Sequence, residues 1–504
     1  MTPLIKETAS PEDSLPPPVH GRLRSFFEKF AVLRGAQREL WLTFLIKLLI
    51  IAAYSITNKT LILWLSADLG FNDQSAAVLI SWVWAPAMTI CTLLAGSVTD
   101  ALGLRRTFFL GVWICLIARV IMAFTSIKWL ALAGGLFPLV VGEALGTPVL
   151  LAATRRYSTI RQRSFSFSLI YVVMNVGYIV AAFIFDYVRQ HFGEHRSFLL
   201  LGVPMTTYRT LFAVSLSFEV LLLPVIYFLR RGAEASEDGV RFAAEPIRHA
   251  NASIIERFFL TVRDSGAETV RLFRRLLSQS GFYRLLVFLL LIGFLKLIFM
   301  QMEYVFPKFG IRELGPGAPV GRLSAINYFV IILLVPIIGV LTQQYSAYRM
   351  VIVGGVICAA SVFVMALPTG WFQTWTTSSL AEWMGHGYLG LKGDIHPYYV
   401  MTAIYITIFS VGEAFYSPRV YEYAAAIAPP GQEASYGALS YIPMLIGKLL
   451  VGTGGWLLAA FCPEHGPRHS GTMWLIFALA ATVAPVGLVL LRRYIRVPEA
   501  GRFD

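Results

Sequence analysis

The sequence GSVTDALGLRR at residues 96–106 is followed 243 residues later by GVLTQQYSAYR at residues 339–349. A repeat at this distance in a chain of 504 residues indicates that one structural unit occurs twice. The alignment pairs Gly96 with Gly339, Thr99 with Thr342, Asp100 with Gln343 and Arg106 with Arg349.

The tetrapeptide VGEA forms a second repeat, at residues 141–144 and 411–414, and each copy is followed by a proline at the same distance. This repeat has an offset of 270 residues, which is 27 more than the first. One insertion reconciles the offsets, because the connection at about residues 369–397 is longer than its counterpart at 126–128 by about that number. The repeats together predict two halves of the same architecture.

The whole chain is more apolar than a soluble protein. It is 57% hydrophobic and 14% charged, whereas soluble domains carry about 25% charged residues. The apolar residues form blocks near the roughly 20 residues that cross a bilayer. We therefore predict an all-α membrane protein with twelve transmembrane helices in two pseudo-symmetric six-helix bundles. The expected spans are residues 39–66, 76–98, 107–125, 129–153, 164–187, 208–229, 283–306, 322–344, 350–368, 398–424, 436–460 and 472–491.

The basic residues, which give a net charge of +13, lie at alternate ends of these spans and do not form one soluble cluster. This placement argues against nucleic-acid binding and predicts that the basic loops and both termini are cytoplasmic. We expect a multi-pass integral membrane protein, in the inner cell membrane if the source is bacterial. Apolar residues at helical spacing over 255–277 predict an amphipathic helix, either on the membrane surface or packed on the bundle. The expected segments are a disordered tail 1–37, an N-terminal bundle 38–230, a linker 231–282, a C-terminal bundle 283–494 and a tail 495–504.

The first repeat resembles the loop motif between helices two and three of the major facilitator superfamily, in which Gly, Asp and Gly precede basic residues. The resemblance implies alternating access, with a charge latch at the inner gate that engages carboxylates and helix ends. The residues that it places in this gating motif are Gly96, Asp100, Gly103, Arg105 and Arg106, with Arg349 in the second copy.

A narrower resemblance is to the proton-coupled oligopeptide transporters. Gly412 and Glu413, then Ser417-Pro418 and Ala428-Pro429, keep the spacing of that family's tenth helix, where the Glu is associated with the peptide's amino terminus. YSITNKTLILWLSADLG at residues 54–70 is similar to its first helix. The family's Glu-x-x-Glu-Arg motif is absent, because residues 49–53 read LIIAA, and Thr147 stands where its helix-four Lys is expected.

Four charged residues fall near the centres of predicted spans: Glu143, Lys296, Glu413 and Lys448. A charge at the centre of a helix costs about 2.5 to 3.5 kcal/mol on insertion scales, so these groups should avoid lipid. One interpretation is structural Glu–Lys pairing within the bundle. The other is a site for a zwitterion or an anion in the central cavity that the superfamily's architecture implies, where a Glu also carries a proton.

Polar side chains at nearby depths are candidates to line this cavity: Tyr54, Asn58, Tyr171, Asn175, Asn327 and Tyr328. Each of them can equally be an ordinary hydrogen bond between helices. Lys47 and Lys59 lie off centre, where a long side chain can reach the interface, and rank lower. Arg119 and Glu219 fall on spans three and six, which the resemblance places at the periphery, so they are not assigned to the site.

We therefore predict a secondary active transporter of a small polar or zwitterionic solute, such as a di- or tripeptide or an amino-acid-like compound, with protons as the expected coupling ion. An exporter or uniporter of an amphipathic or anionic compound, and a non-transporting receptor that reuses the fold, are alternatives. The sequence has no phosphate-binding loop, nucleophile motif or metal-ligand spacing, so no enzyme activity, cofactor or metal is expected. The expected partners are the small-molecule substrate and membrane lipids, and the expected state is a monomer.

Overall fold

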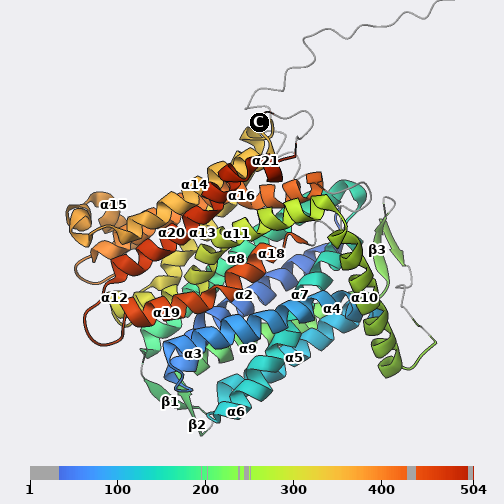
Figure 1. Ribbon diagram of the computed structural model, residues 1–504. Helices are drawn as coiled ribbons and strands as arrows, with labels where there is room; N and C mark the ends of the chain where they lie inside the picture. Colours follow the sequence, from blue (N-terminus) through green and yellow to red (C-terminus); the bar gives the residue numbers. More distant parts are fainter. Residues whose placement is uncertain are drawn as a thin grey trace, which may run out of the picture.

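The computed structural model describes residues 33, 35–194, 196–200, 202–236, 239–242, 249, 251–427, 439–497 and 503. Most of the two predicted tails and the Ala428-Pro429 pair lie outside these residues. The described part contains 12 helices that are long and apolar enough to cross a membrane, which confirms the predicted number. Figure 1 shows them running side by side as one elongated bundle.

The membrane-spanning elements follow the predicted order, and several spans are built from consecutive helical pieces. In the first half they are α2 (Arg38–Ala67), α3–η3–α4 (Asp73–Val78, Leu79–Trp84, Ala85–Leu102), α5 (Leu104–Phe124), α6–η4–α7 (Lys128–Leu130, Ala131–Leu136, Phe137–Arg156), α8 (Ile160–Phe192) and α9 (Thr207–Tyr227). In the second half they are α11 (Ser280–Tyr304), α13 (Val320–Leu341), α14–η5 (Ala347–Phe363, Val364–Ala366), α16 (Pro397–Ile427), α18–α19 (Ile442–Leu449, Val451–Phe461) and α20 (Ser470–Leu490).

The connections divide between the two ends of the bundle. We call the end that carries Arg38, Ser280 and Leu490 the terminal face, and the other end the opposite face. The terminal face carries α10 (Ile254–Leu277), β3 (Ala233–Ser236), β4 (Gly239–Phe242) and α21 (Arg492–Ile495). The opposite face carries β1 (Ser197–Leu200), β2 (Val203–Thr206), α12 (Phe306–Leu314), η6 (Thr369–Trp375), α15 (Ser379–Glu382) and η7 (Trp383–Tyr388).

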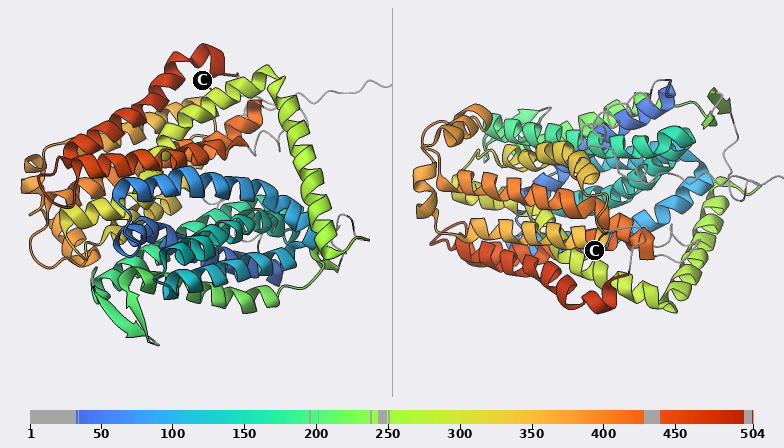
Figure 2. Two further views of the ribbon diagram at one scale, coloured as in Figure 1. Left: turned by 60° about the horizontal axis from the view of Figure 1, so that its bottom comes forward. Right: turned by 90° about the horizontal axis from the view of Figure 1, so that it is seen from above.

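The helix predicted in the linker is present as α10, which packs against α4 and lies across the membrane spans in both views of Figure 2. Phe259, Val270 and Leu277 remain exposed on it. The hairpin β3–β4, which precedes α10, was not predicted.

The internal repeat is visible in the packing of two helix pairs. A Cβ atom added to Gly142 of α7 would lie 2.5 Å from the Cys115 sulfur of α5. A Cβ atom added to Gly412 of α16 would lie 2.6 Å from the Cys358 sulfur of α14. Only glycine allows backbones to approach this closely, as is common where membrane helices cross. The two halves therefore repeat the same helix crossing, and each crossing places a glutamate, at 143 or 413, directly after its glycine.

Candidate functional site

The glutamate of the first half belongs to a buried triad. Arg119 of α5 donates from Nη1 to Glu219 of α9 at 2.7 Å and from Nη2 to Glu143 of α7 at 2.9 Å. Its Nε donates to the Thr57 hydroxyl of α2 at 3.3 Å. The three charged side chains are 1 to 5% exposed. Arg119 and Glu219, which were not assigned to the site, do not line the cavity described below, but their helices turn both side chains inward, where they form the triad with Glu143.

The glutamate of the second half pairs with a cation on a helix that does not correspond to the helix of Arg119. Lys296 of α11 lies 3.2 Å from Glu413 of α16, which confirms a Glu–Lys pair at this position. The other Glu413 oxygen accepts a hydrogen bond from Asn327 of α13 at 3.1 Å. Both oxygens are thus occupied within one half of the protein. Glu143 and Lys448, by contrast, do not form an ion pair with each other.

A third buried ion pair joins the two halves. The Lys59 amine of α2 lies 3.0 Å from Glu303 of α11, and the two side chains are 1% and 6% exposed. The Tyr328 hydroxyl of α13 donates to the same oxygen of Glu303. The position of Lys59 in its span had suggested that its side chain reaches the membrane interface. The side chain instead pairs with Glu303 inside the protein. In the sequence, the feature that could have indicated this pair is a basic residue and an acidic residue that each lie within an apolar block.

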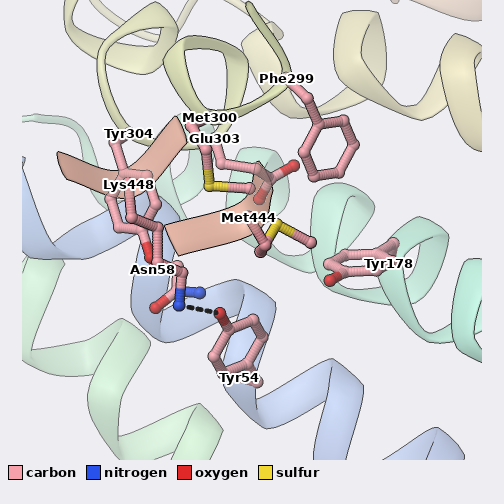
Figure 3. Close-up of a pocket in the computed structure, with 9 residues that line it drawn as sticks. All are labelled: Tyr54, Asn58, Tyr178, Phe299, Met300, Glu303, Tyr304, Met444 and Lys448. Atoms are coloured by element: carbon pink, nitrogen blue, oxygen red, sulfur yellow. Dashed lines mark hydrogen bonds between the residues drawn. The ribbon is translucent and has the colours of Figure 1, made fainter. Parts of the chain in front are cut away.

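A cavity of about 60 Å³ lies between the halves, beside this ion pair. Figure 3 shows that residues from both halves enclose it. It is lined by Tyr54, Asn58, Tyr178, Phe299, Met300, Glu303, Tyr304, Met444 and Lys448. The predicted residues Tyr54, Asn58 and Lys448 are therefore brought together, with Glu303 added.

Two other predicted residues of the first half do not line this cavity. The Asn175 amide donates to the Tyr171 carbonyl of its own helix at 2.8 Å. Tyr171 packs near Phe415, toward the terminal face. These two residues fit the interpretation as helix contacts better than a role in the cavity.

Lys448 differs from the paired cations Lys59, Arg119 and Lys296, because none of the described residues within ion-pair distance of it is a carboxylate. Buried Lys47 also has no carboxylate partner among the described residues, but it does not line the cavity. It is 9% exposed. Its amine lies 3.4 Å from the Tyr54 hydroxyl (Figure 3) and 3.4 Å from the Met88 sulfur. It also lies 5.3 Å from the centre of the Trp84 ring. These neutral contacts do not balance a buried positive charge.

The opposite face is closed by polar contacts between the halves. Asp186 near the end of α8 accepts hydrogen bonds from the backbone amides of Gly321, at 2.9 Å, and Arg322, at 2.6 Å, at the start of α13. Asp73 of α3 binds both Lys308 and Arg312 of α12, the latter at 2.7 Å. These contacts could not be predicted from the sequence, because charged residues near helix ends carry no periodic signal that identifies their partners.

The gating motif lies at the terminal face. Gly103 has a φ of 83°, which suits glycine, and joins α4 to α5. Arg105 donates to the Tyr227 carbonyl at 2.7 Å, so one basic residue does engage a helix end, within its own half. Arg106 and Arg349 are exposed, and nothing is described of the side chain of Asp100, which follows Gly96 by one helical turn.

Solved structures share this architecture along almost their whole length. A POT family transporter in complex with a thioalcohol conjugated peptide has a TM-score of 0.66 at 15% identity, over 91% of this chain and 97% of that one. A POT family transporter in complex with 5-aminolevulinic acid has a TM-score of 0.66 at 15% identity, over 92% and 98%. A structure described under substrate recognition in proton dependent oligopeptide transporters has a TM-score of 0.63 at 17% identity, over 91% and 98%. At these identities the likeness establishes the fold.

The sequence comparisons establish the family. No curated protein matches this sequence significantly. The sequence model of the Major Facilitator Superfamily matches residues 43–391, which is more than half of the chain. That match agrees with the twelve spans, the repeated helix crossings and the motif around Gly103. The chain therefore belongs to the major facilitator superfamily.

Proposed function

We propose that this secondary active transporter carries a small zwitterion, whose carboxylate binds Lys448 and whose amino group binds Glu303. The observation that carries the proposal is the buried Lys448 amine, which faces the cavity between the halves without a carboxylate among the described residues. A buried charge is costly unless it is paired. A substrate carboxylate would supply the missing negative charge, and Tyr54 and Asn58 offer hydrogen bonds beside it.

Glu303 suits the amino group. One of its oxygens is bound by Lys59 and Tyr328. The other, Oε2, is buried and has no hydrogen-bond partner among the described residues. A substrate ammonium group would satisfy this oxygen. The amino-group site is thus Glu303, which lines the cavity, and not Glu413, whose two oxygens are occupied.

The small cavity favours a compact substrate. Pockets for drug-sized ligands usually measure about 300 to 1,000 Å³, whereas this one measures about 60 Å³. An amino-acid-like zwitterion or a dipeptide requires less widening than a longer peptide. The POT family structure in complex with 5-aminolevulinic acid, which carries an amino group and a carboxyl group, supports this class of substrate.

The contacts between the halves indicate which face of the transporter is closed. The ion pair Lys59–Glu303 borders the cavity, and the contacts of Asp186 and Asp73 join the two halves at the opposite face. The terminal face carries the basic loops, which favour the cytoplasmic side of a membrane. We therefore assign the terminal face to the cytoplasm and the structure to the state in which the outer face is sealed.

Thermal stabilisation of the purified protein tests the proposal, because a ligand that binds the folded state raises its melting temperature. The probes are dialanine and 5-aminolevulinic acid, each beside an analogue whose carboxylate is replaced by a carboxamide. We expect at least one zwitterion to stabilise the protein and its amide to have little effect. Lys448→Met should remove the stabilisation, and the control Lys47→Met, on buried Lys47 of α2, should keep it.

Proteoliposomes then show whether the stabilising zwitterion is transported. Stabilisation without uptake would favour a receptor over a transporter. Equal stabilisation by acid and amide, full stabilisation of Lys448→Met, or no stabilisation by either zwitterion would each contradict the proposed site.

A further inference from the structure

The triad around Arg119 contains more negative charge than positive charge. One guanidinium faces two carboxylates, Glu143 and Glu219, and all three side chains are at most 5% exposed. If both acids are ionised, the cluster carries one uncompensated negative charge inside the bundle. Burial disfavours an unpaired charge strongly, so one bound proton would make the triad neutral.

One oxygen of the triad is free to take that proton. Oε1 of Glu143 is bound by Arg119, whereas its Oε2 is buried and has no hydrogen-bond partner among the described residues. Glu413, at the duplicated position of the second half, has one cation and no unpartnered oxygen. The same helix crossing therefore holds a balanced pair in one half and an acid in excess in the other.

We infer that Glu143, held by Arg119 beside Glu219, is the site that carries the coupling proton. A proton from water adds to the free carboxylate oxygen and neutralises the triad, and it returns to water when the cavity opens to the other side. The inference rests on the proposed transport function, because it assigns the ion that is moved with the substrate. It also offers a proton site for a chain in which residues 49–53 of the first span contain no acid.

The surroundings of the triad connect the proton to the substrate. Lys448 interacts electrostatically with Glu143 from the cavity side. Among the described residues, Cys115 of α5 and Tyr304 of α11 also interact electrostatically with the triad. While Lys448 is unpaired, its charge helps to hold Glu143 ionised. A substrate carboxylate on Lys448 cancels that charge, so substrate and proton should bind cooperatively, as symport requires.

Infrared difference spectra of the purified protein between acidic and alkaline buffer test the site, because a protonated carboxyl has a band of its own and no substrate is needed. We expect a buried carboxyl band in the wild type. Glu143→Gln should remove it, and so should Glu219→Gln, because each variant leaves one acid for Arg119. Glu413→Gln, at the duplicated position, is the matched control and should keep the band.

Lys448→Met tests the link to the substrate site. Loss of the nearby positive charge should move the midpoint of the band to higher pH by on the order of one unit, the effect of a unit charge across a partly hydrated cavity. The inference is overturned if the band survives both Glu143→Gln and Glu219→Gln, if Glu413→Gln removes it, or if Lys448→Met leaves its midpoint in place. A normal band in a protein that binds no zwitterion would contradict only the proposed substrate.

Discussion

The Lys59–Glu303 pair is where one substitution should most clearly change the balance between transport states. The charged atoms are 3.0 Å apart, and the side chains are 1% and 6% exposed. Removing one partner of a buried pair costs about 3 to 5 kcal/mol, because the other charge stays buried without compensation. The pair joins the two halves, so it should separate, and its groups should become hydrated, when the outer face opens.

Lys59→Met should therefore raise the free energy of the sealed state more than that of the outward-open state. At 1.36 kcal/mol per tenfold change, about 3 to 5 kcal/mol shifts the equilibrium toward the outward-open state by roughly a hundredfold to a few thousandfold. The contacts of Asp186 and Asp73 stabilise the sealed state equally in the wild type and in Lys59→Met, so they cancel when the two proteins are compared.

Spin labels on the opposite face measure this shift. Ala67 and Pro316 are exposed there on different halves, so a label pair at these positions reports their separation. We expect Lys59→Met to populate a longer distance in proteoliposomes. Lys47→Met is the matched control, because Lys47 is buried on the same helix and pairs with no carboxylate among the described residues. An unchanged distance in Lys59→Met, or the same change in both variants, would refute the reasoning.

Two further substitutions test the duplicated helix crossings and their acids. Gly142→Ala places a Cβ atom 2.5 Å from a buried sulfur and should lower stability by about 1 to 3 kcal/mol, whereas Gly339→Ala meets nothing within 4 Å and should be neutral when both are melted in detergent. Glu413→Gln leaves Lys296 without its acid, so we expect uptake to be abolished while membrane insertion is retained; full transport by this variant would show that the pair is dispensable.

The repeats and the apolar blocks were sufficient to predict the twelve spans and the two halves. Both are properties of the chain itself, because the length of an apolar block must match the bilayer and a duplicated segment keeps its spacing. Spans two, four and eleven were less regular than expected, since η3 and η4 interrupt spans two and four and span eleven is divided into α18 and α19. Such irregularities depend on the packing of neighbouring helices.

The four central charges could also be recognised in the sequence, because a charge within an apolar span is unusual wherever the span packs. Their partners could not. The depth of Glu143 does not say which helix faces it, so Arg119 was overlooked although its span was known. The repeat was no guide either, since the residue aligned with Arg119 in the second half is Val362.

Sequence by itself thus determined that this protein crosses a membrane with two related bundles and that it buries ionisable groups within them. Only the tertiary structure decided which groups meet: Arg119 with Glu143 and Glu219, Lys59 with Glu303, and Lys448 with no acid among the described residues. The physical reason is that ion pairing depends on atoms a few ångströms apart, and the rotation and crossing of helices fix that separation.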